Sequence, residues 1–276
     1  INFNMINLGI IGYGIVGKAT AHGFKRSNYK IYHYDKFVAG NTLEETVKKS
    51  QIIFICLPTP YKGDRISLSI IDENIAEITK VTDGTDKIIV IKSTVIPGTT
   101  ANYSKKYPKS HFIFNPEFLT EAHANEDFIN ADRIVIGGED KKSLKIVEDL
   151  YKKRFPKTPI FVSGSKTAEM VKYMANCYLA TKVMFANEIH SLCEKLNIPY
   201  KDVKKMVTAD KRIFDSHLDI TEHKGFGGKC FPKDMIAIMG LYKDIGVDHS
   251  LLKTVWEKNL KIRQHKDWEE IPFVKE

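Results

Sequence analysis

The sequence predicts an α/β protein in which a Rossmann-like, doubly wound and mostly parallel sheet precedes an all-α domain with a long central helix. Two observations support this prediction. Over residues 1–163, short apolar runs alternate with amphipathic stretches, which is typical of strand–helix–strand units. From Ser165 to Leu196 the chain then continues without glycine or proline. We therefore expect two domains, residues 1–163 and residues 164–276.

The strands are expected where apolar, largely β-branched runs lack alternation, because strands buried on both faces have this composition. Six such runs are residues 6–11, 31–34, 51–58, 87–94, 111–116 and 133–138, and a last strand is expected within 156–165. Amphipathic helices are expected between them, as at residues 43–50 and 143–153. Right-handed crossovers should connect the parallel strands.

A helix is predicted from Ser165 to about Leu196, with Ser163 or Ser165 as its N-cap. Its apolar residues recur at three- and four-residue steps, and its length suits a spine between domains or a dimer contact. We expect a homodimer through this helix. A short helix at 200–208, a loop at 210–229 and helical segments to about residue 266 should follow.

Composition excludes several classes of protein. Hydrophobic residues make up 43% and charged residues 28%, the balance of a soluble globular protein, and 42 Lys+Arg against 34 Asp+Glu leave a net charge of +8. No apolar run reaches the ~18 residues of a membrane span, and the N-terminus lacks the features of a secretory signal. The lysines are scattered, so we expect no nucleic-acid partner. Histidine spacing predicts no metal site. The cysteines are widely spaced, which favours a reducing cytoplasm; they are Cys56, Cys177, Cys193 and Cys230.

A dinucleotide-binding fingerprint follows the first predicted strand. In Gly12-Tyr13-Gly14-Ile15-Val16-Gly17, the first glycine suits a tight turn, the second a close approach to a pyrophosphate, and the third packing of the next helix on the strand. Asp35 ends the second strand, where a carboxylate accepts hydrogen bonds from the adenosine ribose and repels a 2′-phosphate. The pattern predicts NAD as the cofactor. The alternative is a glycine turn that binds no cofactor.

The most informative stretch is Gly225-Phe226-Gly227-Gly228-Lys229-Cys230-Phe231-Pro232-Lys233-Asp234. Its glycines allow a close approach to a ligand, and Cys230 stands where a helix is expected to begin. The helix N-terminus and the neighbouring lysines Lys229 and Lys233 favour a thiolate. Asp234 lies one turn beyond Cys230, so both can face one pocket. The alternative is a glycine turn with a small buried cysteine, as expected for the other three cysteines.

Seven segments together resemble the UDP-glucose/GDP-mannose dehydrogenase family over about residues 6–265. They are Gly12–Gly17, Phe54–Pro60, Lys92–Thr99, Asn115–Glu121 with Asp127–Phe128, Asp132–Gly137, the pair Lys172 and Asn176, and Gly225–Asp234. The resemblance implies an NAD-dependent oxidation of a nucleotide sugar by four electrons, with UDP-glucose as substrate and UDP-glucuronate as product. A primary alcohol would become an aldehyde and then a carboxylate.

The resemblance also implies the roles of the catalytic residues. Cys230 would attack the aldehyde to form a thiohemiacetal, and a second hydride transfer would leave a thioester for water to hydrolyse. Lys172 and Asn176 would stabilise the oxyanion. Asp234, Thr94 and Glu117 would move protons or orient water. Without the family, Lys172 and Asn176 could be a solvated helix face, Thr94 could merely end a strand, and Glu117 could be a surface turn residue.

The resemblance further implies the binding residues. On the cofactor side these add Pro58, Thr59, Thr94, Glu121 and Lys233 to the fingerprint and Asp35. On the substrate side they are Glu117, Phe118, Leu119, Thr120, Lys172, Asn176, Gly225, Phe226 and Gly227, with Arg212 reaching the substrate of a neighbouring subunit. Family members carry a third, C-terminal α/β domain for the nucleotide, which the residues after about 266 are too few to build. We expect another chain or a longer gene product to supply it.

Two other functions remain open at this point. A β-hydroxyacid-type dehydrogenase shares a Rossmann-like half, an all-α half and a Lys-x-x-x-Asn helix, but has no use for Cys230. A non-catalytic relative that binds NAD or a nucleotide sugar is the second. The combination of Cys230, Lys172, Asn176 and Asp234 favours the enzyme.

Overall fold

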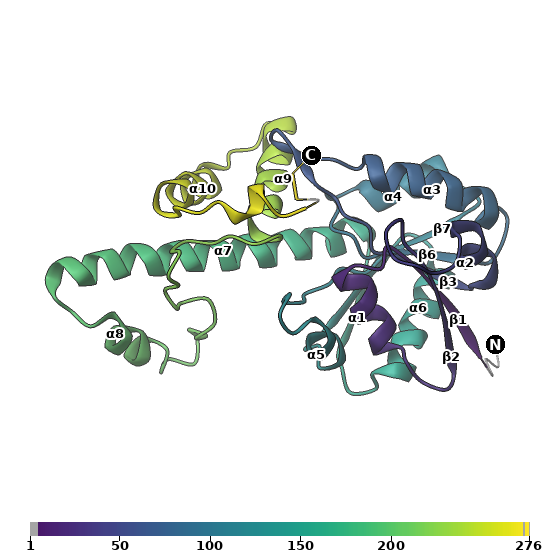
Figure 1. The fold of residues 1–276 in the computed structure, drawn as a ribbon, viewed down its shortest axis with the longest axis horizontal. Helices are drawn as coiled ribbons and strands as arrows, with labels where there is room; N and C mark the ends of the chain where they lie inside the picture. Colours follow the sequence, from purple (N-terminus) through teal and green to yellow (C-terminus); the bar gives the residue numbers. More distant parts are fainter. Residues whose placement is uncertain (1–4, 273, 276) are drawn as a thin grey trace. The chain divides into compact units, whose positions relative to one another are not determined.

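The computed structural model describes residues 5–272 and 274–275, which form two compact units. The first unit contains the described residues up to Thr59 together with Ser67–Lys172, and the second contains Pro60–Ile66 and the residues from Tyr173 onward. Helix α7 (Ser165–Leu196) belongs to the first unit as far as Lys172 and to the second thereafter (Figure 1).

A seven-stranded sheet forms the centre of the first unit, with the strand order β2-β1-β3-β6-β7-β8-β9. Its strands are β1 (Ile6–Ile11), β2 (Tyr29–Tyr34), β3 (Ile52–Ile55), β6 (Ile88–Ile91), β7 (His111–Phe114), β8 (Ile134–Gly138) and β9 (Ile160–Ser163). Every neighbouring pair is parallel except β7 and β8. The predicted α/β fold with a mostly parallel sheet is confirmed.

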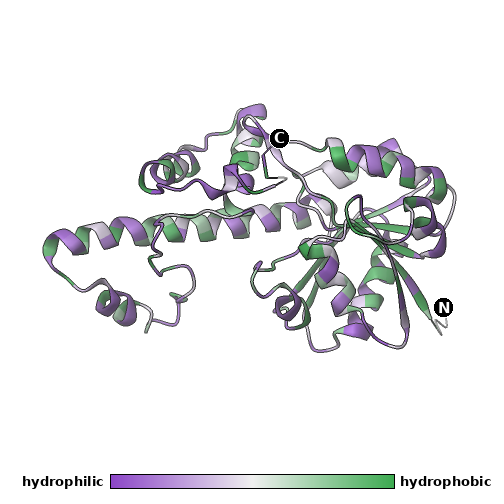
Figure 2. Ribbon diagram, in the orientation of Figure 1, coloured by the Kyte–Doolittle hydropathy of each residue, from purple (hydrophilic) through white to green (hydrophobic). Residues whose placement is uncertain are grey.

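Helices cover both faces of this sheet. They are α1 (Ile15–Gly23), α2 (Leu43–Lys49), α3 (Ser69–Thr82), α4 (Thr99–Lys106), α5 (Ala124–Ile129) and α6 (Lys141–Arg154). Successive strand residues point to opposite faces, so Phe54 packs in the core under α1, α5 and α6, whereas Ile53 packs in the core under α2, α3 and α4. This double burial explains the uninterrupted apolar runs of central strands such as β3 and β6, whose residues are all buried. Figure 2 shows much of the sheet in green.

The strand order places a topological switch point between β1 and β3, because the chain leaves β1 for β2 on one side and continues to β3 on the other. In open α/β sheets, ligands bind outside the carboxyl ends of the strands at such a point. The loops after β1, β3, β6 and β7 all leave from that edge. These loops contain most of the first unit's predicted site residues.

The second unit combines the later part of α7 with α8 (Tyr200–Val207), α9 (Phe231–Asp244), α10 (Ser250–Ile262) and the 3₁₀ turn η1 (Asp267–Glu269). It also contains an antiparallel hairpin, β4 (Tyr61–Lys62) and β5 (Arg65–Ile66), which the sequence did not predict. The hairpin packs closely on α9, since a Cβ at Gly240 would lie 2.2 Å from the carbonyl oxygen of Asp64. Tyr61, Ile236 and Trp268 share one apolar cluster.

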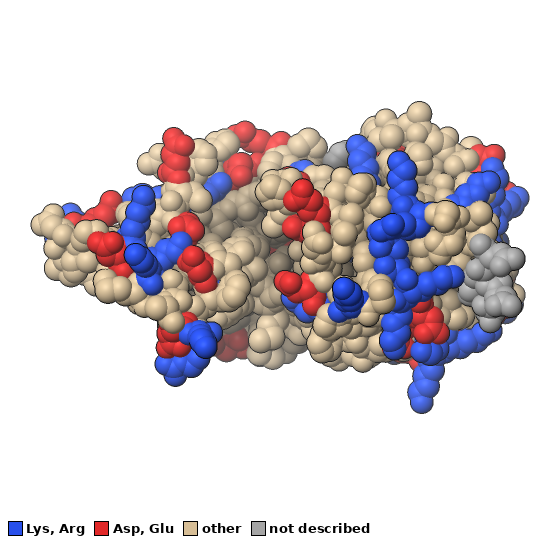
Figure 3. All heavy atoms as spheres, turned by 90° about the horizontal axis from the view of Figure 1, so that it is seen from below, with Lys and Arg blue, Asp and Glu red and all other residues tan. Residues whose placement is uncertain are grey.

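Basic side chains are prominent on one face of the first unit. Figure 3 shows many lysine and arginine side chains close together there, with few acidic side chains among them. An open groove of about 720 Å³ is lined in part by Lys18, Lys25 and Arg26. Within the described residues, no helix combines the length and apolar composition needed to cross a membrane.

Candidate active site

The glycine loop between β1 and α1 has the geometry of a dinucleotide-binding turn. Gly12 has φ +90°, and a Cβ there would lie 2.5 Å from the carbonyl oxygen of Cys56. A Cβ at Gly17 would lie 2.0 Å from the carbonyl oxygen of Gly12, so the helix can pack here only without a side chain. A Cβ at Gly14 would meet nothing within 4 Å, and no side chain caps α1. Open space beside an uncapped helix N-terminus fits a pyrophosphate.

Asp35 follows β2 and is held beside this loop. Its Oδ2 accepts a hydrogen bond from the backbone N–H of Tyr13 at 2.7 Å, and its Oδ1 accepts from the N–H of Phe37 at 2.8 Å and of Val38 at 3.2 Å. Carboxylate oxygens each have two lone pairs, so Oδ2 can still accept from a ribose hydroxyl. The loop and Asp35 therefore fit NAD, which would lie with its pyrophosphate against Gly14–Ile15 and its adenosine ribose near Asp35.

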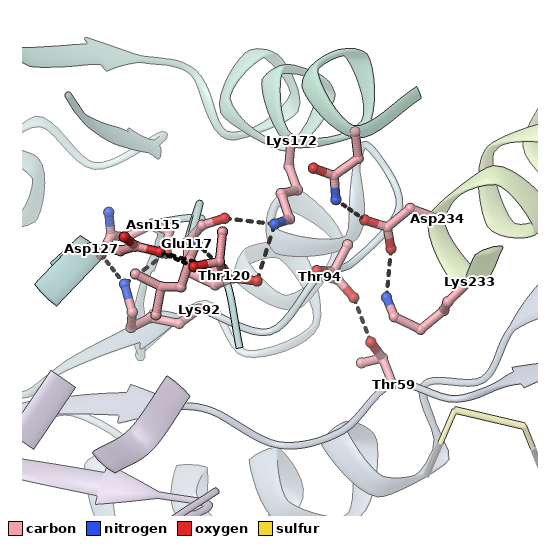
Figure 4. Close-up of polar contacts among 12 residues, drawn as sticks. Thr59, Lys92, Thr94, Asn115, Glu117, Thr120, Asp127, Lys172, Lys233 and Asp234 are labelled. Carbon is pink, nitrogen blue, oxygen red and sulfur yellow. Dashed lines mark hydrogen bonds and ion pairs between the residues drawn. The ribbon is translucent and has the colours of Figure 1, made fainter. Parts of the chain in front are cut away.

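The loops after β3 and β6 hold each other. Thr59 Oγ1 donates to the carbonyl oxygen of Thr94 at 2.9 Å (Figure 4), and Ser93 Oγ donates to that of Leu57 at 2.7 Å. These bonds bring the loop of Pro58 and Thr59 together with that of Thr94. The cofactor contacts of these residues stay a prediction. Thr94 lies beyond the last residue of β6, and its own hydroxyl has no partner among the described residues.

Glu117 and Lys172 form a buried ion pair in the first unit. Lys172 Nζ lies 3.0 Å from Glu117 Oε1 and donates to the carbonyl oxygen of Glu117 at 2.7 Å (Figure 4). The two side chains are only 10% and 4% exposed, for Glu117 and Lys172 respectively. The alternatives of a surface turn residue and of a solvated lysine are therefore wrong.

The Glu117 carboxylate is kept ionised by its surroundings. Burial alone would raise its pKa, but the Lys172 ammonium, the N–H of Leu119 and the charge of Lys92 together hold the pKa below its usual range. The Leu119 N–H donates to Oε2 at 2.8 Å. An ionised carboxylate with a lysine beside it can act as a base or as an electrostatic partner in proton transfer.

The residues after Glu117 are held by side chains from outside this loop. Asp127 Oδ2 accepts from the N–H and the hydroxyl of Thr120 at 2.7 and 2.6 Å (Figure 4), and the Arg133 guanidinium lies 4.2 Å from the centre of the Phe118 ring. Phe118 and Leu119 are half-buried, whereas Thr120 and Glu121 are exposed. Phe118 and Thr120, two of the predicted substrate-side residues, are thus held by contacts with Arg133 and Asp127.

Glu169 joins the start of α7 to α4 and was missed by the sequence analysis. Its buried carboxylate accepts from the N–H of Gly98 at 2.5 Å and of Thr100 at 2.8 Å. It lies one turn before Lys172 on α7, so it fixes the helix that carries this lysine to the loop that carries Thr94. The only signal for Glu169 in the sequence is its position on the predicted long helix, close to Lys172.

A second cluster lies at the start of α9 in the second unit. Cys230 is the N-cap residue, Pro232 stands in the first turn, and the N–H of Asp234 donates to the carbonyl oxygen of Cys230 at 2.9 Å. Asp234 is 1% exposed and accepts from Asn176 Nδ2 at 2.5 Å and from Lys233 Nζ at 2.6 Å. Asn176 is buried, so the solvated-face alternative is wrong for it as well. Cys230 is half-buried.

The glycine loop before Cys230 is held by buried polar residues that the sequence analysis did not single out. The Asn259 side chain accepts from the N–H of Phe226 at 2.8 Å and donates to its carbonyl oxygen at 3.0 Å. Asn187 accepts from the N–H of Gly225 at 3.2 Å. Gly225 has φ +54°, and a Cβ there would lie 2.3 Å from Asn259 Oδ1. Only glycine fits this approach.

Two other cysteines, Arg212 and the division of the site residues between the units complete the description. Burial raises the pKa of Cys56 to about 12 and that of Cys177 well above its usual range, as expected for unreactive thiols. Arg212 is 88% exposed and pairs with Asp210 at 2.6 Å. Glu117, Lys172 and Thr94 belong to the first unit, whereas Asn176, Cys230, Lys233, Asp234 and Arg212 belong to the second.

A dinucleotide loop with an acidic residue after the second strand, followed by a helical unit, defines a nicotinamide-dinucleotide-binding protein of the dehydrogenase type. The chain belongs to the UDP-glucose/GDP-mannose dehydrogenase family. Residues 30–155 match the family's NAD binding domain and residues 166–261 match its central domain. The resemblance inferred from the motifs and the predicted cofactor, NAD, are confirmed.

Relatives extend this assignment. The chain is 38% identical over 224 residues to the UDP-glucose 6-dehydrogenase of Rickettsia bellii, covering 78% of this chain and 50% of the relative. It resembles the structure of a UDP-glucose dehydrogenase from Pyrobaculum islandicum with a TM-score of 0.86 and 28% identity, covering 94% of this chain and 69% of the other. The chain thus spans about half the length of the curated relatives it matches.

The fold is also shared with a 3-hydroxyisobutyrate dehydrogenase of Mycobacterium tuberculosis. The TM-score is 0.74 and the identity 14%, over 93% of both chains. At this identity the likeness concerns the fold alone. The fold therefore does not tell a nucleotide-sugar dehydrogenase from a hydroxyacid dehydrogenase. The side chains of this chain's own site must do so.

Proposed function

We propose that this chain is the cofactor-binding and catalytic part of an NAD-dependent nucleotide-sugar dehydrogenase that oxidises UDP-glucose to UDP-glucuronate. The observation that carries the proposal is Cys230 at the N-terminus of α9, with the buried Asp234–Asn176 pair one turn further. A thiol in this position has no role in a simple alcohol oxidation. It has one in an oxidation that continues from aldehyde to acid.

The first unit supplies the cofactor site and a lysine–carboxylate pair. NAD, when bound, accepts the hydride in each of the two oxidations. Lys172 donates hydrogen bonds to developing oxyanions, which a buried ammonium stabilises strongly. Glu117, held ionised by its neighbours, accepts a proton from water in the final hydrolysis. Thr94 orients that water or the sugar hydroxyl through its hydroxyl group.

The second unit supplies the nucleophile. The Cys230 sulfur adds to the carbonyl carbon of the aldehyde, the C=O π bond breaks, and the oxygen takes a proton, giving a thiohemiacetal. Loss of the hydride from this carbon and of the proton from its hydroxyl oxygen forms the C=O bond of the thioester. Water then adds to the thioester carbon, the C–S bond breaks, and the carboxylate leaves while the thiol is restored. Asp234 handles the thiol proton, and Asn176 holds Asp234 in place.

An assay of NADH formation tests this function. Protein, NAD and UDP-glucose are mixed and the absorbance of NADH is followed. GDP-mannose and UDP-N-acetylhexosamines are tested as alternative substrates in separate reactions. We expect two NADH per UDP-glucose. Cys230→Ala should lower the rate of acid formation at least ~100-fold, whereas the matched control Cys193→Ala, on α7, should retain it. The chain should be assayed alone and with any C-terminal partner domain.

The outcomes separate the proposed function from the two alternatives. Turnover of a β-hydroxyacid that survives Cys230→Ala would establish the β-hydroxyacid-type enzyme. Tight NAD binding without turnover of any nucleotide sugar would establish a non-catalytic relative. A reactive thiol and a pyridine dinucleotide both suit a reducing compartment, so we expect the protein in the cytoplasm.

We further propose a homodimer through the later part of α7. Met174, Tyr178, Phe185, Leu192 and Leu196 are all more than half exposed and follow one another at four- and seven-residue steps. This spacing puts them on one face of the helix, which Figure 2 shows as repeated green segments. A second copy of the same stripe is a self-complementary partner for it. In such a dimer the exposed Arg212 would have to exchange its pairing with Asp210 for contacts with the partner's substrate.

A further inference from the structure

Lys92 is a buried lysine that none of the roles above uses. It follows β6 directly and is 3% exposed. Burying an ammonium group is costly unless it is paired and hydrogen-bonded. Its Nζ lies 2.8 Å from Asn115 Oδ1 and 3.4 Å from the Asn115 carbonyl oxygen, and 5.5 Å from the centre of the Phe128 ring. These are neutral partners, so the charge needs another explanation.

Asn115 contacts Lys92 and lies two residues before Glu117, so it connects the two. Its Oδ1 also accepts from the Tyr151 hydroxyl at 2.5 Å, and its Nδ2 donates to the Val135 carbonyl oxygen at 2.7 Å. Its backbone N–H donates to the carbonyl oxygen of Ile91 at 2.9 Å. The side chain is therefore fixed from three directions. Pro116 follows, and Glu117 comes next, so the start of the loop that carries Glu117 is set by this arrangement (Figure 4).

The charges around Lys92 place Glu117 between two cations. Glu117 is attracted by Lys92 as well as by Lys172, and the two ammonium groups repel each other. Cys56 is the other titratable group that interacts with Lys92. An ammonium group buried against neutral partners carries a desolvation cost that such hydrogen bonds offset only in part. Stability therefore does not account for an ammonium group here.

We propose that Lys92 is a positioning residue for Glu117. Its ammonium group fixes the Asn115 side chain and, through it, the turn that aims the Glu117 carboxylate at Lys172. Its charge also favours the carboxylate form that pairs with Lys172. This inference rests on the proposed function for its consequence in catalysis, but its structural content does not depend on any substrate.

The test compares Lys92→Met with the wild-type chain and with Lys87→Met. Lys87 precedes the same strand at its opposite end, is half-buried, and donates to the carbonyl oxygens of Lys48 and Ser50 at 2.9 and 2.6 Å. It therefore serves as a control lysine that is hydrogen-bonded to neutral groups on the same strand but away from Glu117. Carbon-13 NMR of labelled glutamate follows the titration of Glu117, whose resonance is assigned with Glu117→Gln. We expect the Glu117 midpoint to rise by ~1 pH unit in Lys92→Met and to stay in place in Lys87→Met.

An unchanged Glu117 midpoint in Lys92→Met, or an equal rise in Lys87→Met, would overturn the proposal. If circular dichroism shows that Lys92→Met does not fold, Lys92→Gln removes the same charge and is judged by the same criteria. In the NADH assay, kcat should fall ~10-fold in Lys92→Met while KM for NAD stays within about twofold. If the wild-type chain oxidises no substrate, the proposed function fails, and the NMR titration still decides the role of Lys92.

Discussion

The Lys233 ammonium group lies 2.6 Å from Oδ1 of Asp234, its neighbour in the chain, while Asn176 occupies the other carboxylate oxygen. The side chains of Lys233 and Asp234 are 11% and 1% exposed. The lysine that the family resemblance assigns to the cofactor thus has a structural partner beside the candidate nucleophile. This pairing leads to the first prediction.

Lys233→Met should destabilise the protein because it leaves the Asp234 carboxylate buried without a cation. Breaking a buried pair in this way costs ~3 kcal/mol of unfolding free energy. Asp234→Asn in the same chain should recover much of that loss, so the two changes should be coupled by more than ~1 kcal/mol in urea unfolding. Additive effects on stability would contradict the pair. Weaker NAD binding with unchanged stability would instead assign Lys233 to the cofactor alone.

Two glycines of the dinucleotide loop should respond differently to alanine. Gly14→Ala adds a methyl group in open space, so the melting temperature should barely change while NAD affinity falls at least ~10-fold. Gly17→Ala forces a Cβ to 2.0 Å from the Gly12 carbonyl oxygen, so both stability and NAD affinity should fall. Calorimetry gives both quantities. Equal NAD affinity in Gly14→Ala and wild type would place the pyrophosphate elsewhere.

Glu117→Gln should change how stability depends on pH. The pKa of Glu117 is lower in the folded than in the unfolded chain, so its contribution is fully present above its unfolded pKa, near 4.5, and is lost as the pH falls through the folded value. At pH 7 the variant should be ~3 kcal/mol less stable, because Lys172 loses its buried partner. Urea unfolding at several pH values should show this gap narrowing in acid. A constant gap would contradict the ionised pair.

Phe185→Glu should convert the proposed dimer to a monomer. Phe185 is 62% exposed at the centre of the apolar stripe on α7, and a carboxylate there would face its own copy across a two-fold axis. Light scattering coupled to size-exclusion chromatography gives the mass directly. The control Lys195→Glu changes a charge near the end of the same helix and should leave the mass unchanged. A wild-type chain of monomeric mass would end this proposal.

The sequence by itself determined the local elements and the family. Apolar runs mark the places of all seven strands of the main sheet, although the runs 51–58 and 87–94 are longer than the strands Ile52–Ile55 and Ile88–Ile91. The signal is clearest for the central strands, because a strand buried on both faces does not alternate with polar residues. Freedom from glycine and proline marks α7 at its observed bounds, Ser165–Leu196. The glycines at 12, 14 and 17 predict the turn from sequence because their role is steric and local.

Only the tertiary structure decided which polar residues are buried and what they contact. The β4–β5 hairpin has two residues in each strand, too few to carry a periodic signal, and it depends on α9. Lys92, Glu169 and Asn259 look like ordinary polar residues in the sequence, yet each is buried against a loop that is distant in the chain. Periodicity reports which face of an element is apolar. The partner of a buried charge depends on which segments the fold brings beside it, and that is set by the packing of the whole chain.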